Sequence, residues 1–180
     1  MSRPSLETAI RTFATERHYS ATTTERWLQL SSTDAAPLLD LARELRPSEH
    51  QLRDLWEWAE DIAERDAVAL AQVLTAESIA TVRQRAVSRN DKLKLVKGAL
   101  RRVRFPQLAA VELQLATLVR ELDLPRSVRL ILPDFLEGSE VHVAVLATDA
   151  AALHAAALAL VRAATSPACA KIFDLLAEAP

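Results

Sequence analysis

The stretch RQRAVSRNDKLKLVKGALRRVR, residues 83–104, combines a helical pattern with a strong excess of positive charge. Leucine, valine and alanine recur in its second half at three- and four-residue steps, so that on a helix they fall within an arc of about 160°. Most of the lysines and arginines there fall on the opposite side. The stretch therefore predicts an amphipathic helix with one face for a core and the other for water or a polyanion.

Local signals set the ends of this helix. Ser88 and Asp91 have the spacing of a capping box in its acidic variant, and Asp91 suits the positive end of the helix dipole. Pro106 biases Phe105 away from helical backbone angles. We expect the helix to begin near Arg89 and to stop at Phe105.

The charge of the chain is divided into blocks. Residues 83–104 hold 9 basic side chains against Asp91 alone, whereas residues 1–82 carry 8 basic and 14 acidic ones and residues 105–180 carry 5 and 9. These blocks cancel in the net charge of −2. The change near residues 81–90 predicts a division into an N-terminal helical region, 1–82, and a second region, 83–180.

The flanking sequence predicts a mainly α protein of the α+β class: an N-terminal helical bundle, then helix, helix, β-hairpin, helix, helix. Helical periodicity covers the first region, and Ser48 with Gln51 forms a capping box before the helix at 49–65. Alternation with a period of two at 128–132 and 141–145 predicts one antiparallel hairpin. Helices are expected from Pro106, from Asp149 and from Pro167.

Several classes of site are excluded or unsupported. The chain has two glycines, Gly98 and Gly138, so neither a P-loop nor a dinucleotide fingerprint is present, and its one cysteine, Cys169, excludes an intramolecular disulfide. No apolar run approaches a membrane span and the N-terminus has no secretory pattern, so we expect a cytoplasmic protein without membrane contact.

Catalysis has no positive support in the sequence. The four histidines, His18, His50, His142 and His154, lie in different predicted elements, and no pair has the spacing of a helical zinc site. No nucleophile elbow is present. We therefore expect a non-enzymatic protein with no catalytic residue, metal or cofactor. The acidic face of the helix at 49–65, which carries five carboxylates, leaves a carboxylate-based enzyme as the least favoured alternative.

The basic face suggests a partner. A row of exposed lysine and arginine side chains releases counterions from DNA or RNA and gives affinity that depends on salt more than on sequence. DNA is the favoured partner. The predicted contact residues are Lys94, Lys97, Arg101, Arg102 and Arg104, helped by Arg83, Arg85 and Arg89.

Two other interpretations of the basic face stay open. The face is either simply solvated, or it docks on an acidic protein surface, including the acidic face of residues 50–64 within the chain or in a homo-oligomer. The protein would then be an adaptor or oligomerisation module. Trp58, at the margin of the apolar stripe of its helix, is a candidate partner-contact residue.

The order of several segments resembles the region downstream of the nucleotide domain in bacterial ParB-like partition proteins. The resemblance rests on ERWLQL at 25–30, APLLDLARELR at 36–46, HQLRDLWEWAEDIAERD at 50–66, LRRVRFPQLAAVELQLATLVRELDLP at 100–125 and VRLILPDFLEGSEVHV at 128–143. It implies a helical DNA-associated or assembly module for chromosome partition. Nothing in the chain corresponds to the ParB/sulfiredoxin-type nucleotide domain of that family, so no nucleotide-binding residue is carried over.

Overall fold

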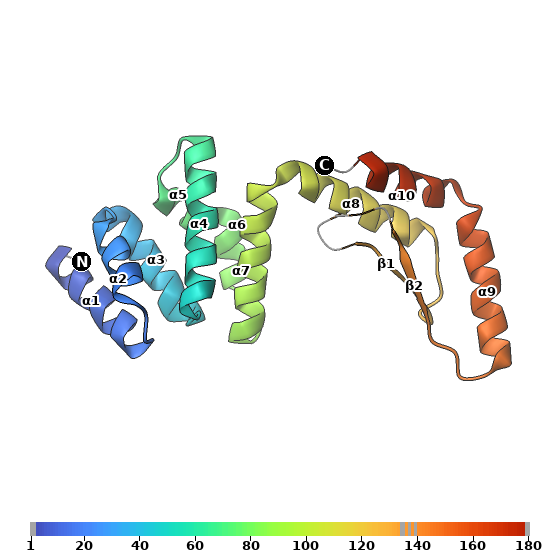
Figure 1. Ribbon diagram of the computed structural model, residues 1–180, viewed down its shortest axis with the longest axis horizontal. Coiled ribbons are helices and arrows are strands. Elements are labelled where there is room, and N and C mark those ends of the chain that lie inside the picture. The colour runs from blue at the N-terminus through green and yellow to red at the C-terminus, as the bar shows by residue number, and fades with distance from the viewer. Residues whose placement is uncertain (1–2, 134–135, 137, 139, 179–180) are drawn as a thin grey trace. The chain divides into compact units, whose positions relative to one another are not determined.

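A computed structural model describes residues 3–133, 136, 138 and 140–178 (Figure 1). The structure confirms the predicted fold class, α+β with mainly α-helices. The chain divides into two units, residues 1–104 and 105–180. The first unit is helical. Its helices are α1 (Arg3–Glu16), α2 (Ala21–Gln29), α3 (Ser32–Leu45), α4 (Glu49–Asp66), α5 (Leu70–Thr75), α6 (Glu77–Arg83) and α7 (Arg89–Arg104).

The core of the first unit is built on tryptophan and leucine side chains from α1 to α4. Trp27 of α2 and Trp56 of α4 are fully buried, with ring centroids 6.4 Å apart, and Phe13 of α1 meets Trp27 edge to face at 6.2 Å. The predicted capping box begins α4: Ser48 accepts a hydrogen bond from the Gln51 amide, and the Gln51 side chain accepts one from the Ser48 amide. The cap fixes where the chain turns into α4.

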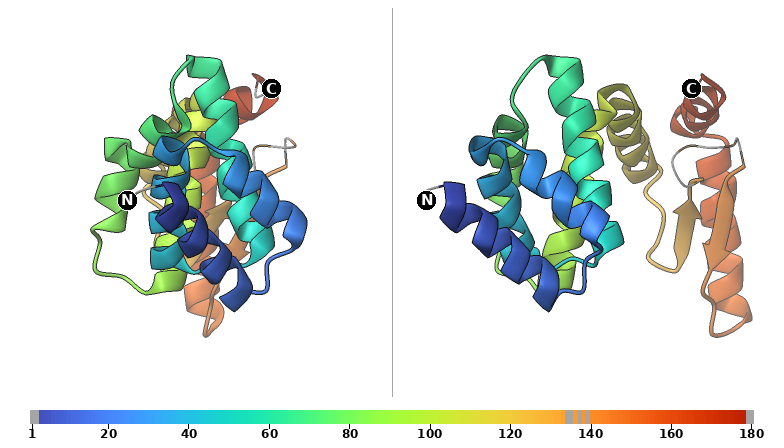
Figure 2. Two further views of the ribbon diagram at one scale, coloured as in Figure 1. Left: turned by 90° about the vertical axis from the view of Figure 1, so that its left-hand side faces the viewer. Right: turned by 60° about the vertical axis from the view of Figure 1, so that its left-hand side comes forward.

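Helix α7 belongs to this first unit. Leu93, Val96, Ala99 and Leu100 are buried in the same hydrophobic cluster as α3 and α4, and Figures 1 and 2 show α7 running beside α4. The helix begins at Arg89 and ends at Arg104, as the capping and proline signals predicted. Because α7 packs on what precedes it, the division between the units follows α7, whereas the charge pattern had placed it before α7.

The second unit contains the β-hairpin and three helices. β1 (Val128–Ile131) pairs antiparallel with β2 (His142–Val145), with Leu130 opposite Val143, which confirms the predicted hairpin. Leu130 packs on a core formed chiefly by α8 (Pro106–Glu121) and α10 (Pro167–Glu178), to which α9 (Ala150–Ala164) adds Ala163. The predicted loop at 133–139 lies partly outside the described residues.

In the part of the chain that the structure describes, no helix alone has the length and apolar character needed to cross a membrane. α9 and α10 pass that test only as a pair, bent by 68°.

Candidate nucleic-acid interface

The basic helix α7 is held on one side by acidic side chains of α4. Lys97 Nζ lies 2.8 Å from Asp54 Oδ2, and Arg104 lies 2.6 Å from Asp61. The same two cations lie over the ring of Trp58, at 5.1 Å from its centroid for Lys97 Nζ and 5.9 Å for Arg104 Cζ. Half-buried Trp58 thus contacts cations of its own chain, and two of the predicted nucleic-acid contacts are already paired.

A second acidic group holds the start of α7 from the α3 side. Glu44 accepts hydrogen bonds from Arg83 Nε at 2.7 Å and from Lys92 Nζ at 2.9 Å. Burial of the Glu44 carboxyl acts to raise its pKa, but the hydrogen bonds and charges of Lys92 and Arg83 together outweigh burial, so that the pKa lies below its ordinary value. Glu44 is therefore a charged anchor that joins α3 to α6 and α7.

The C-terminal end of α7 receives a cation from α4. Arg65 donates hydrogen bonds of 2.8 Å to the carbonyl oxygens of Val103 and Arg104. A guanidinium at this position satisfies carbonyl groups that no helical amide reaches and lies at the negative end of the helix dipole. Helix α7 is thus fixed near both ends by side chains that come from earlier in the chain.

The remaining predicted cations face solvent. Arg85 lies in the loop before α7, Arg89 is the first residue of α7, and Lys94 and Arg102 lie on its outward face. All four are exposed, and none forms an ion pair with any residue that the structure describes. Arg101 is half-buried. Lys94, Gly98 and Arg102 follow one another at four-residue steps and so form one stripe along α7.

Apart from half-buried Arg101, the predicted contact residues fall into two groups. Arg83, Lys97 and Arg104 are engaged by carboxylates of α3 and α4, whereas Arg85, Arg89, Lys94 and Arg102 form what we call the open basic face. Sequence periodicity had placed Lys97 and Arg104 on the polar side of the helix correctly. The acidic face of residues 50–64 was one of the alternative partners considered for the basic face, and Asp54 and Asp61, which pair with Lys97 and Arg104, belong to it.

Among the residues described, no three or more His, Cys, Asp or Glu side chains are grouped in a way that would hold a metal ion. His50 Nε2 lies 3.7 Å from Asp54 Oδ1, one helical turn away. The acidic residues Asp54, Glu57, Glu60 and Asp61 of α4 are engaged with Lys97, Arg26 and Arg104.

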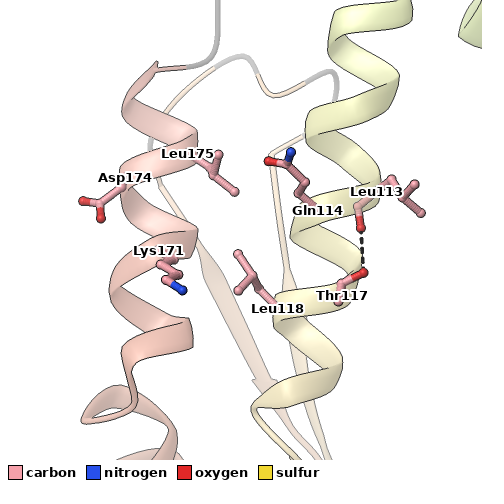
Figure 3. A pocket seen from close by; sticks show the side chains of 7 residues that line it. All are labelled: Leu113, Gln114, Thr117, Leu118, Lys171, Asp174 and Leu175. Atoms are coloured by element: carbon pink, nitrogen blue, oxygen red, sulfur yellow. Dashed lines mark hydrogen bonds between the residues drawn. The ribbon is translucent and has the colours of Figure 1, made fainter.

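A groove between α8 and α10 was not foreseen from the sequence (Figure 3). It has a volume of about 520 Å³, and Leu118 of α8 and Leu175 of α10 face each other across it. Lys171 and Asp174 of α10 also line it. Leu113 lies at its edge with 67% of its surface exposed. No sequence pattern indicated this groove, because a periodic pattern does not show how far two helices separate.

No protein-family model matches the chain, and searches of curated proteins and of solved structures gave no significant match. The resemblance to ParB-like partition proteins accordingly stays a prediction.

Proposed function

We propose that this protein binds the backbone of nucleic acid, DNA in preference to RNA, through the open basic face, and that it catalyses no reaction. The observation that carries this proposal is the set of four exposed cations, Arg85, Arg89, Lys94 and Arg102, that have no ion-pair partner among the described residues. Cations in this state attract phosphate without first breaking an existing ion pair.

The engaged cations have a different role in this proposal. Lys97 and Arg104 are bound to carboxylates, so each would have to exchange a carboxylate for a phosphate before contributing affinity. Together with Glu44 they hold α7 in a fixed position on α3 and α4. A rigid helix presents Lys94 and Arg102 at a constant spacing, which lowers the entropy lost on binding.

The resemblance to ParB-like proteins supports a biological setting for this activity. It suggests a DNA-associated module that works in chromosome partition beside a separate protein carrying the nucleotide domain. The fold class of both units, helical with one hairpin, is compatible with that setting.

A second candidate function, an oligomerisation or adaptor module, is favoured by α9. Leu153, Leu158 and Val161 are exposed to 55%, 53% and 62%, and they share the outward face of this alanine-rich helix with few polar groups. Exposed apolar faces of this kind mark protein contacts. Self-association that depends on protein concentration, and that Leu158→Glu abolishes in sedimentation velocity runs, would support this function.

The nucleic-acid proposal is tested by fluorescence anisotropy with labelled duplex DNA and RNA across a salt series. The test variant is Arg85→Glu/Lys94→Glu/Arg102→Glu. A matched control, Arg11→Glu/Arg126→Glu/Arg129→Glu, changes the net charge equally at exposed arginines that also lack ion pairs within the described residues. Circular dichroism verifies that both variants are folded.

We expect the wild type and the control to bind DNA with a clear salt dependence, and the test variant to lose most of the affinity. The slope of log K against log salt should fall by roughly 0.9 for each phosphate contact removed. Equal losses in both variants would mean general charge attraction, and the absence of binding at low salt would reject the proposal.

A further inference from the structure

A pocket of about 360 Å³ lies between α1 and α3, on elements that the proposed nucleic-acid face does not use. Three arginines line it: Arg17, just after α1, Arg43 in the last turn of α3, and Arg46 at the C-cap of α3. Glu16 and Phe13 of α1 line it as well. Three guanidinium groups against one carboxylate give the lining an excess of positive charge.

The arginines of this pocket differ from several other cations of the first unit. Arg26, Arg53, Arg65, Lys97 and Arg104 each form an ion pair with a carboxylate of the chain. Arg43 and Arg46 are exposed and have no such pair with any described residue, and Glu16 forms none either. Cations that outnumber the carboxylates at a concave site raise the local concentration of anions.

The side chain of Arg17 is held by hydrogen bonds to the backbone. One terminal nitrogen donates hydrogen bonds of 2.9 Å to the carbonyl oxygens of Arg46 and Pro47. Its Nε is buried and has no hydrogen-bond acceptor within the described part of the chain. A buried donor without an acceptor is costly, so its retention calls for a compensating role. Holding Arg46 beside α1 is one such role.

Arg46 has a left-handed backbone conformation, as Ala67 has at the C-cap of α4. Its φ of 44° and ψ of 54° place it in the left-handed region at the helix C-cap, where glycine or asparagine is normally preferred. Glycine would hold this conformation with less strain than arginine.

The side chains that line the pocket indicate which class of ligand it can bind. Guanidinium groups bind phosphate through two parallel N–H···O bonds, and several of them in one pocket favour a group with more than one negative charge. The volume lies near the lower end for small-molecule sites, and the Phe13 ring offers an apolar contact for the rest of a ligand. We propose that this pocket binds a small phosphate-bearing molecule, of the phosphate-monoester or diphosphate class.

The test is isothermal titration calorimetry, which measures the affinity of the full chain for pyrophosphate at constant ionic strength. Arg43→Gln should weaken binding about tenfold, as expected for the loss of one charge-assisted contact. Arg46→Gly should weaken binding to a similar degree while raising the thermal midpoint, because glycine relieves the positive φ. A purely structural role of the Arg46 side chain would not produce these opposite effects.

Arg85→Gln is the control, since it removes an exposed arginine of the open basic face and leaves the pocket intact. We expect it to bind pyrophosphate like the wild type while its affinity for DNA falls. No pyrophosphate binding up to millimolar concentration, or an equal loss in Arg85→Gln and Arg43→Gln, would overturn the proposal. So would a result in which Arg43→Gln weakens DNA binding and pyrophosphate does not bind, because the phosphate recognised would then be that of the nucleic acid.

Discussion

Lys97 of α7 and Asp54 of α4 form an ion pair of 2.8 Å that joins the most basic helix of the chain to its most acidic one. The two residues are far apart in the sequence, and their side chains are 29% and 23% exposed. Together with the pair of Arg104 and Asp61, this contact means that much of the charge imbalance in the sequence is compensated inside one unit. What remains on the surface of α7 is a narrower basic stripe.

This ion pair makes a testable contribution to stability. We expect Asp54→Lys to lower the free energy of unfolding by about 1 kcal/mol, because a cation then faces Lys97 in place of its carboxylate. The double variant Asp54→Lys/Lys97→Asp should recover part of that loss, though not the contact of Lys97 with Trp58. Urea titrations followed by tryptophan fluorescence measure both. Additive effects of the two substitutions would show that the pair is not coupled.

The lowered pKa of Glu44 predicts how the free energy of unfolding depends on pH. Its pKa in the folded protein is lowered: burial opposes this, but Lys92 and Arg83 outweigh burial. A carboxyl whose folded pKa lies below its unfolded value of about 4.3 contributes its full stabilisation above that value and loses it as the pH falls through the folded pKa. We expect Glu44→Gln to be less stable than the wild type at pH 7, and the difference to shrink toward pH 3.

The control for this measurement is Glu25→Gln, at an exposed position of α2 without an ion pair among the described residues. Its stability should follow the wild type across the whole pH range in thermal unfolding monitored by circular dichroism. If Glu44→Gln also follows the wild type from pH 3 to pH 7, then Glu44 is not the anchor that its contacts with Arg83 and Lys92 indicate.

A substitution at Gly98 can change the stability of α7 without changing its charge. A β-carbon at this position would lie 3.6 Å from a terminal nitrogen of Arg102, which is an ordinary van der Waals distance. We therefore expect Gly98→Ala to raise the free energy of unfolding by about 0.5–1 kcal/mol, since alanine loses less backbone entropy in a helix. DNA affinity should change less than twofold, because Lys94 and Arg102 are kept. A large loss of affinity would mean that phosphate approaches the backbone at Gly98.

The limits of α7 could be predicted because the signals for them are local. Ser88 accepts a hydrogen bond of 3.2 Å from the Asp91 amide at one end, and Pro106 follows Phe105 at the other. The hairpin was predictable for a similar reason, since a period of two in the sequence is the period of the strand itself. Each of these features depends on residues within a few positions of one another.

The candidate sites depend on residues that are distant in the sequence. No local pattern indicates that Glu44 binds Lys92, or that Arg17 donates to the carbonyl of Arg46, because both contacts arise from how α1, α3 and α7 pack. The same holds for the limits of the units. The charge changes sign at residue 83, but the packing changes after residue 104, since the apolar face of α7 is buried on the preceding helices.

The limits of the first unit can be tested by comparing fragments. α7 buries Leu93, Val96 and Leu100 in the core of this unit, and removing such side chains costs several kcal/mol out of a typical total of about 5–15 kcal/mol. We expect a fragment of residues 1–104 to unfold cooperatively, with a midpoint close to that of the full chain. Tryptophan fluorescence can follow both transitions, because all three tryptophans lie within residues 1–104.

A fragment of residues 1–82, cut where the charge changes, is the matched comparison in this experiment. Without α7 it exposes the apolar surfaces of α4 and α6 that α7 covers, and it leaves Glu44, Asp54 and Asp61 without their cations. We expect it to keep helical circular dichroism, to bind a hydrophobic dye and to unfold without a cooperative transition. A cooperative transition in the shorter fragment at the midpoint of the longer one would show that α7 is not part of the first core, and the rigid presentation of Lys94 and Arg102 would then lose its structural basis.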